Sequence, residues 1–321
     1  MDSTVMRLVP CLVGVVMMAI AIPAQSLQLY RTIQPSVRHE APQGGLLLLG
    51  GGEWPQGSMA WFAGRAGHGR VVSLGASGSR ETHEEYQQAF GAVWSLDTVV
   101  IESAADARDP QVLDLLKHAD GVFIRGGDQA RYVRWWAGSP IPQILEERFK
   151  HHAVIGGTSA GLAVLGRWAY GALDDGSTTA LEAITDPMGS AQTLVEGFLK
   201  FEPLANVITD SHVDRRERLG RLVSWVQRIN AHRPPEQAVW GLGVDEGVGI
   251  EWEPTHQGRV VGWQGGQIHW VGPGSRSRVM PEHTLSVQEV PIVHIGVGQT
   301  TTLPLVKTQA PTQWWTINPE D

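Results

Sequence analysis

The 321-residue sequence contains a single cysteine, Cys11, which lies in an apolar stretch near the start of the chain. Once that stretch is removed, the chain has no thiol, which excludes disulfide bonds, thiolate zinc sites and a cysteine nucleophile. Basic charge is also scarce, since 25 Lys and Arg residues against 33 Asp and Glu residues give a formal net charge of -8. We therefore expect no nucleic acid partner, because phosphate backbones are bound by basic surfaces.

Motifs for metals and dinucleotides are missing as well. No helix-like stretch contains H-E-x-x-H, and the adjacent His151 and His152 would point apart. A dinucleotide-binding loop that starts at Gly50 needs another glycine five residues later, where this chain has Pro55. The sequence thus predicts no metal site and no cofactor.

Residues 1–26 have the pattern of a signal peptide. Arg7 precedes an apolar run from Leu8 to Ile22, and small residues suited to cleavage follow it. A membrane anchor or a buried helix is the alternative, but the run is short for a hydrocarbon layer about 30 Å thick. We expect signal removal, no stable membrane anchor and an exported protein, either periplasmic or extracellular. Residues 27–44 are expected to form an exposed leader.

From residue 45 onward, short apolar runs alternate with helix-like stretches, which is typical of a mostly parallel sheet covered by helices. Strands are predicted at 45–49, 71–74, 98–101, 121–124 and 153–155, and helices at 81–90, 110–118, 142–150 and 216–229. Because these strands are apolar throughout, both faces of the sheet should be buried. We predict a three-layer α/β domain over residues 45–254, followed by a β-rich C-terminal extension, 255–321, packed on the same domain.

The stretch Gly157-Thr158-Ser159-Ala160-Gly161 matches the G-x-S-x-G nucleophile elbow. An apolar run leads into it and a helix-compatible run leads out, so Ser159 would lie on a tight strand-to-helix turn. The start of that helix would direct N–H groups at developing negative charge, with the amide of Ala160 as oxyanion donor. The motif alone does not separate such a site from a glycine-rich turn around a buried serine.

A serine nucleophile needs a base and a group that orients the base. His212 is the predicted base because, among 12 histidines, it alone lies in a dense polar cluster, residues 210–218; a solvated helix face would also explain this cluster. For the third group we rank Glu182 and Asp174 equally and Asp175 behind them, since all three lie between Ser159 and His212 in the chain.

Further polar residues are expected to face the same site. Gly126 and Gly127 follow the predicted strand 121–124, so a backbone N–H near Gly127 would supply the second oxyanion donor, and Gln129 would bind substrate. Strand termination alone would also explain this turn. Arg216 would share a helix face with His212, ready to clamp a carboxylate with two hydrogen bonds.

Together these motifs resemble the serine peptidase family that contains cyanophycinase and aspartyl dipeptidase, whose fold is like that of the class I glutamine amidotransferases. The shared blocks are Gly50-Gly51-Gly52-Glu53, Gly126-Gly127-Asp128-Gln129, Gly156-Gly157-Thr158-Ser159-Ala160-Gly161, Asp210 and His212 with Arg216 and Arg218, and Gly243-Val244-Asp245-Glu246. The resemblance implies Ser159 as nucleophile and His212 as base. It also implies a substrate site lined by Gln129, Asp210, Arg216 and Arg218, and hydrolysis of short or unusual aspartyl peptides without a cofactor.

Two departures from the family pattern concern the substrate. Ser211 stands where cyanophycinases tend to carry glutamine, and Gly247-Val248-Gly249 replaces the usual threonine-alanine. We expect a cyanophycinase-like serine exopeptidase that hydrolyses peptides of the β-Asp-Arg type through an acyl-enzyme on Ser159, with Ser211 among its substrate contacts. The alternatives are an α-aspartyl or isoaspartyl dipeptidase and an inactive peptide-binding protein of the same fold. A peptide, with cyanophycin one hypothesis, is the expected partner; the oligomeric state stays open, a homodimer being one option.

Overall fold

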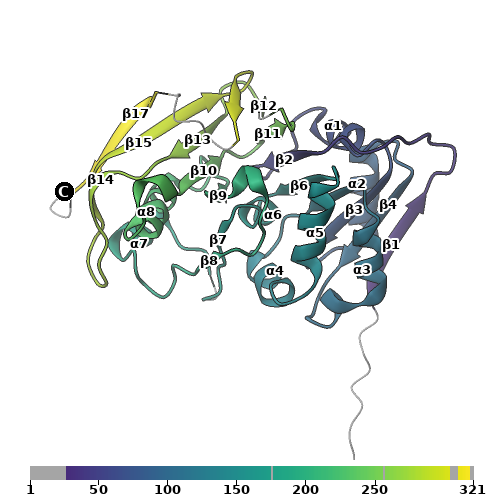
Figure 1. Cartoon of the computed structure of the whole chain (residues 1–321), viewed down its shortest axis with the longest axis horizontal. Coiled ribbons are helices and arrows are strands. Elements are labelled where there is room, and N and C mark those ends of the chain that lie inside the picture. The colour runs from purple at the N-terminus through teal and green to yellow at the C-terminus, as the bar shows by residue number, and fades with distance from the viewer. Residues whose placement is uncertain (1–26, 175, 256, 304–309, 319–321) are drawn as a thin grey trace, which may run out of the picture.

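The computed structural model describes residues 27–174, 176–255, 257–303 and 310–318. The predicted signal segment, with Cys11, lies outside these residues. The molecule is elongated, with one sheet and its helices at each end (Figure 1). Among the described residues, no helix is long and apolar enough to cross a membrane.

The first sheet has nine strands, and its centre is parallel as predicted. Strands β4, β3, β5, β6 and β2 run parallel, while β1 and β11 flank them in antiparallel pairing. In sheet order the strands are β1 (Gln28–Ile33), β4 (Ser95–Val100), β3 (Arg70–Gly75), β5 (Gly121–Ile124), β6 (Val154–Thr158), β2 (Gly45–Leu49), β11 (Val248–Trp252), β12 (Gln257–Gly262) and β16 (Thr300–Thr302).

Both faces of this sheet are buried. Along β2, Leu46 and Leu48 belong to one apolar core, and Leu47 and Leu49 to another on the opposite face. Helices α1 (Ser58–Arg65) and α2 (Arg80–Phe90) supply residues to the second core, and α3 (Pro110–Lys117), α4 (Gln129–Trp136) and α5 (Ile141–Lys150) supply residues to the first. The predicted three-layer α/β architecture is therefore confirmed.

The second sheet has eight strands and carries α7 (Ala180–Thr185) and α8 (Leu219–Asn230) beside it (Figure 1). Its order is β14 (Ser275–Arg278), β15 (Ser286–Gly296), β13 (Gln267–Val271), β10 (Trp240–Val244), β9 (Val207–Ser211), β7 (Trp168–Tyr170) and β8 (Leu194–Glu196), with β17 (Gln313–Ile317) pairing with β15. Strands after residue 254 thus join both sheets: β12 and β16 extend the first, and β13, β14, β15 and β17 belong to the second. The domain boundaries drawn from the sequence stay a prediction.

Three local expectations were wrong. Part of the expected leader forms edge strand β1, and Nε of its Arg31 lies 2.5 Å from Oδ1 of the buried Asp97. The residues of β1 are exposed or half-buried, so the sequence has no apolar run that would predict this strand. The helix-compatible run after Ser159 is helical only over the four residues of α6 (Ala160–Ala163), and a Cβ on the nearby Gly166 would lie 2.7 Å from the carbonyl oxygen of Val207. Helix α8 begins at Leu219, so Arg216 lies in a turn and not on the predicted helix.

Candidate active site

Ser159 lies on the strand-to-helix turn that the motif predicts, between β6 and α6. Its backbone has φ 54° and ψ -118°, a region that non-glycine residues seldom occupy and that costs about 1–3 kcal/mol. The flanking glycines make this turn possible: a Cβ on Gly157 would lie 2.7 Å from the carbonyl carbon of Gly161, and one on Gly161 would lie 2.1 Å from the carbonyl oxygen of Ile124. The strained turn presents the Ser159 hydroxyl at the carboxyl end of β6.

The structure brings His212 to Ser159. His212 follows β9, and its Nε2 lies 2.8 Å from Ser159 Oγ, a hydrogen-bond distance. Its Nδ1 lies 2.5 Å from Oε2 of Glu246, which follows β10. Serine, imidazole and carboxylate therefore form one hydrogen-bonded chain, the arrangement used by serine hydrolases to activate the hydroxyl.

The carboxylate in this chain is not one of the candidates drawn from the sequence. Glu182 caps helix α7 by accepting hydrogen bonds from the N–H and hydroxyl of Thr179 at 2.7 and 2.9 Å. Asp174 accepts a hydrogen bond from Ser190. Neither reaches His212, so both assignments were wrong; Asp175 lies outside the described residues.

Strand pairing explains why Glu246 was missed. Strands β9 and β10 are parallel neighbours with Ser211 paired to Val244, so the residues that follow each strand emerge at the same sheet edge. The sequence interpretation placed the acid between serine and histidine in chain order, whereas Glu246 comes after His212. The block Gly243-Val244-Asp245-Glu246 was the available signal.

Gly50, Gly51 and Gly52 lie against His212 and Glu246. The carbonyl of Gly50 accepts a hydrogen bond from the His212 N–H at 2.8 Å. A Cβ on Gly51 would lie 2.2 Å from the imidazole, and one on Gly52 would lie 2.5 Å from Cγ of Glu246. Any side chain at these two positions would displace the triad, so this turn does more than end a strand.

Burial lowers the pKa of His212 below its ordinary value, and the nearby Arg216 and Arg218 add to this effect. The hydrogen bond and negative charge of Glu246 act in the opposite direction and raise the pKa. The lowered pKa favours the neutral imidazole, the form that a general base requires.

The Gly126-Gly127 turn lies against Ser159, where the sequence predicts an oxyanion site. A Cβ on Gly126 would lie 3.3 Å from Cβ of Ser159. The hydroxyl of Tyr132 donates to the carbonyl oxygens of Arg125 and Gly126 at 2.9 and 3.0 Å. Because N–H and C=O point in opposite directions across a trans peptide, the Gly127 N–H faces away from Tyr132. Gly127, Ala160 and Ser159 all line one cavity.

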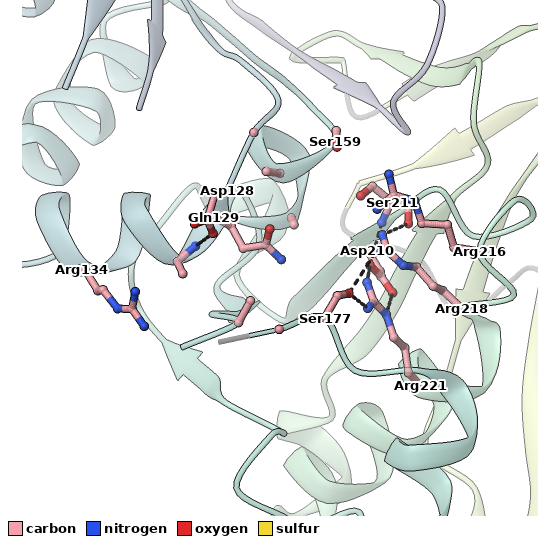
Figure 2. A pocket seen from close by; sticks show the side chains of 16 residues that line it. Asp128, Gln129, Arg134, Ser159, Ser177, Asp210, Ser211, Arg216, Arg218 and Arg221 are labelled. Atoms are coloured by element: carbon pink, nitrogen blue, oxygen red, sulfur yellow. Dashed lines mark hydrogen bonds and ion pairs between the residues drawn. The ribbon is translucent and has the colours of Figure 1, made fainter. Parts of the chain in front are cut away.

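That cavity, of about 490 Å³, also contains all five residues predicted to bind substrate (Figure 2). Gln129, Asp128 and Arg134 lie on one side of it, and the arginines of the segment 216–221 lie on the other (Figure 2). The lining comprises Gly127, Asp128, Gln129, Ala130, Arg134, Ser159, Ala160, Ala163, Ala172, Gly176, Ser177, Asp210, Ser211, Arg216, Arg218 and Arg221. Four arginines against two aspartates favour an anionic ligand.

Asp210 and Arg221 line this cavity and form a buried ion pair. Arg221, which the sequence interpretation missed, donates two hydrogen bonds to Asp210 at 2.6 and 2.8 Å, and both side chains are buried. The guanidinium also lies over the rings of Tyr170 and Trp225. Both oxygens of Asp210 are occupied, so this residue shapes the cavity through Arg221.

Arg218 and Arg216 differ in burial. Arg218 is buried and donates to the carbonyl of Ser211 and to the hydroxyl of Ser177. Burial, followed by the charge of Arg221, lowers the pKa of Arg218 to about 10. Arg216 is exposed and lines this cavity together with a second one.

The second cavity, of about 660 Å³, shares Gly127, Ser159 and Arg216 with the first and is also lined by His212. Its lining includes Glu53, Trp54 and Glu85. Ser159 thus lies at the junction of two cavities, an arginine-rich one and one that carries two carboxylates beside an indole. Within the described parts of the chain, no group of three or more His, Cys, Asp or Glu residues is placed to hold a metal ion.

Removing Arg221 is expected to cost much of the stability of this region. Arg221→Leu would leave the Asp210 carboxylate buried without its partner, which typically costs about 3–5 kcal/mol. The free energy of unfolding, from urea or guanidinium titration, is the measurement. Arg131→Leu is the matched control, because Arg131 and Asp128 form an exposed pair at 3.6 Å that should contribute at most about 1 kcal/mol. Equal losses in the two variants would contradict the expectation.

The chain is similar to known peptidases in sequence and in fold. The model of peptidase family S51 matches residues 46–227. The chain is 29% identical over 248 residues to a cyanophycinase of Synechococcus elongatus, covering 74% of this chain and 71% of that protein. It is 26% identical over 274 residues to a cyanophycinase of Trichormus variabilis, with 82% of each chain covered. The structure of a peptidase from an acI-B1 Actinobacterium superimposes with a TM-score of 0.53 at 17% identity, covering 82% of this chain and 98% of that one, which shows a shared fold. The chain belongs to peptidase family S51, as its motifs indicated, and is a peptidase.

Proposed function

We propose that this peptidase is a cyanophycinase-like exopeptidase that cleaves aspartyl-linked peptides of the β-Asp-Arg type. The observation that carries the proposal is the hydrogen-bonded chain of Ser159, His212 and Glu246 at the junction of two cavities of different charge. Its cyanophycinase relatives provide the substrate hypothesis.

The reaction proceeds through an acyl-enzyme. Ser159 Oγ attacks the peptide carbonyl while its proton moves to Nε2 of His212, and the N–H groups near Gly127 and Ala160 stabilise the oxyanion. The C–N bond then breaks, and the leaving amine takes the proton from His212. Water, deprotonated by His212, attacks the ester and restores the Ser159 hydroxyl. Throughout, Glu246 holds the imidazole and stabilises its protonated form.

The arginine-rich cavity suits the acyl side of the substrate. Ser159 and the two oxyanion residues line it, so the group that carries the scissile carbonyl would lie there. Arg216 is exposed at its edge and can pair with a carboxylate by two hydrogen bonds, and Gln129 faces the same space (Figure 2). These residues support an aspartyl substrate.

The second cavity suits the leaving side. His212, which protonates the leaving amine, lines it together with Glu53, Trp54 and Glu85. Carboxylates and an indole ring attract a guanidinium through charge and cation–π contact. Cyanophycin is a polyaspartate decorated with arginine, so a cut in its backbone leaves arginine on both fragments, and this lining would contact the arginine of the leaving fragment.

An α-aspartyl or isoaspartyl dipeptidase is the second candidate. Ser211 favours it, because a serine lines the cavity where cyanophycinases tend to carry the longer glutamine. An inactive binding protein has less support, since Ser159 Oγ and His212 Nε2 lie within hydrogen-bond distance. Export by the N-terminal segment stays a prediction.

A fluorophosphonate probe and paired substrates test the proposal. We expect the probe to label Ser159 in the mature protein and to lose most labelling in His212→Ala, because the hydroxyl then has no base. Release of β-Asp-Arg from cyanophycin, measured beside cleavage of α-aspartyl and isoaspartyl dipeptides, separates the two candidates. Labelling that is absent from Ser159, or undiminished in His212→Ala, would contradict the mechanism. Turnover of dipeptides alone would favour the second candidate.

A further inference from the structure

The peptide backbone of Glu246 is held from both sides by side chains. Its N–H donates to Oδ1 of Asp214 at 2.8 Å. Its carbonyl oxygen accepts a hydrogen bond from Nε1 of Trp263, also at 2.8 Å. Both contacts fix the main chain and leave the carboxylate of Glu246 free to reach His212. Residues 245–247 connect β10 to β11, and the N–H of Gly247 also donates to the carbonyl of Gly51 at 2.8 Å.

Trp263 comes from the β-rich extension, in the turn between β12 and β13. Its side chain lies against a surface made of glycines: a Cβ on Gly247 would be 3.0 Å from Cδ1 of the indole, and one on Gly266 would be 3.1 Å from Cε2. Trp263 remains 49% exposed. A tryptophan so placed buries less apolar surface than one in a core, and its one hydrogen-bonding group is used on Glu246.

Strand β13, which follows the turn that carries Trp263, holds the residue before Glu246. One carboxylate oxygen of Asp245 accepts the backbone N–H of Gln267 at 3.0 Å, and the other lies 2.8 Å from Nε2 of His269. Both partners belong to β13. Asp245 and Glu246 are therefore bound to the segment 263–269 at consecutive positions, Asp245 through its side chain and Glu246 through its carbonyl.

The position of this turn matters for the proposed chemistry. Glu246 Oε2 lies 2.5 Å from His212 Nδ1, and Gly52 closes the space on the other side of its Cγ. A catalytic group that moves by 1 Å can lose about 10²-fold in rate. A backbone anchor at Glu246 thus acts on the reaction through the orientation of the imidazole.

We infer that Trp263 is a positioning residue for the catalytic carboxylate, so that the turn between β12 and β13 forms part of the active site. The inference rests on the proposed function of Ser159, His212 and Glu246. Trp263 lies beyond residue 227, where the match to the family model ends. The turn thereby gives the β-rich extension a role in the reaction.

Trp263→Phe removes the N–H donor and keeps an aromatic ring over the glycines. We expect kcat to fall about tenfold or more with KM within about twofold, because the acid loses its anchor while the substrate cavities stay intact. The acid limb of the pH profile should also move to lower pH, because the hydrogen bond that His212 donates to Glu246 raises the pKa of His212. Trp314→Phe is the matched control: Trp314 lies in β17, is 59% exposed and should leave both values unchanged.

A double-mutant cycle shows whether Trp263 acts through Glu246. In a Glu246→Gln background, Trp263→Phe should slow fluorophosphonate labelling of Ser159 by less than twofold. Replacement of Trp263 by the N–H-free isostere benzothienylalanine repeats the test if the phenylalanine variant does not fold. An unchanged kcat and pH profile, or an equal loss in both backgrounds, would overturn the inference. Failure of wild-type labelling would instead overturn the proposed function.

Discussion

Ser159→Ala is expected to lower turnover by about 10⁶-fold, since loss of the nucleophile in a serine hydrolase costs about as much as loss of the whole triad. The reason lies in the geometry: Ser159 Oγ lies 2.8 Å from Nε2 of His212 and lines both cavities. Without that oxygen no acyl-enzyme forms, and only binding and the oxyanion donors remain. Initial rates of β-Asp-Arg release, with enzyme in excess for the variant, measure the loss.

Two controls accompany this variant. Its free energy of unfolding should stay within about 0.5 kcal/mol of the wild-type value, because alanine keeps the Cβ and adopts the same strained backbone as serine. Peptide binding, measured by calorimetry, should persist, because the arginines that line the acyl cavity remain. Turnover within tenfold of the wild type would show that Ser159 is not the nucleophile.

The centre of the first sheet was predictable from local pattern alone. Strands β2 and β5 have the predicted bounds, because each is a short apolar run that ends at glycine or arginine next to a turn. Edge strand β1 was not, since its residues alternate irregularly between exposed and half-buried positions. Helix α4 was also missed, because it is short, begins directly after a glycine turn and buries only Ala130, Tyr132, Val133 and Trp136.

The residues of the candidate site also differ in whether the local sequence predicts them. Ser159 and His212 lie in short motifs whose local composition indicates a role. Arg221 looks from the sequence like one more charged residue of a helix, and only the fold shows it buried on Asp210. Glu246 can be recognised as the partner of His212 once β9 and β10 are known to be parallel neighbours. The local sequence of neither strand predicts this long-range pairing.

Glu246→Gln separates the acid in the structure from the acid candidates in the sequence. Glutamine keeps the size of the side chain but loses its charge, and its amide group can donate to Nδ1 of His212. That donation favours the tautomer with a proton on Nε2, which cannot accept the proton of Ser159. The corresponding exchange in a related triad lowers kcat by about 10⁴-fold, and we expect a loss of about 10³ to 10⁴ in kcat/KM.

The pH dependence of the rate is an independent test of the contact between His212 and Glu246. The proposed mechanism requires neutral His212, so the rate should be full above its pKa and fall as the pH drops through that value. Because burial lowers this pKa and Glu246 partly restores it, the acid limb of the wild type should lie below the ordinary histidine value, and that of Glu246→Gln lower still. A limb that moves to higher pH would contradict this account.

Glu182→Gln is the matched control, because it makes the same chemical change in a carboxylate that the sequence favoured equally with Asp174. Glu182 lies in the capping box of α7, and glutamine can fill that position with little loss of stability. We expect kcat/KM and the pH profile of this variant to equal those of the wild type. If Glu182→Gln lost activity while Glu246→Gln kept it, the 2.5 Å contact between Glu246 and His212 would have no part in catalysis. The reverse result assigns the orienting role to Glu246. This residue follows β10, the parallel neighbour of the strand β9 that precedes His212.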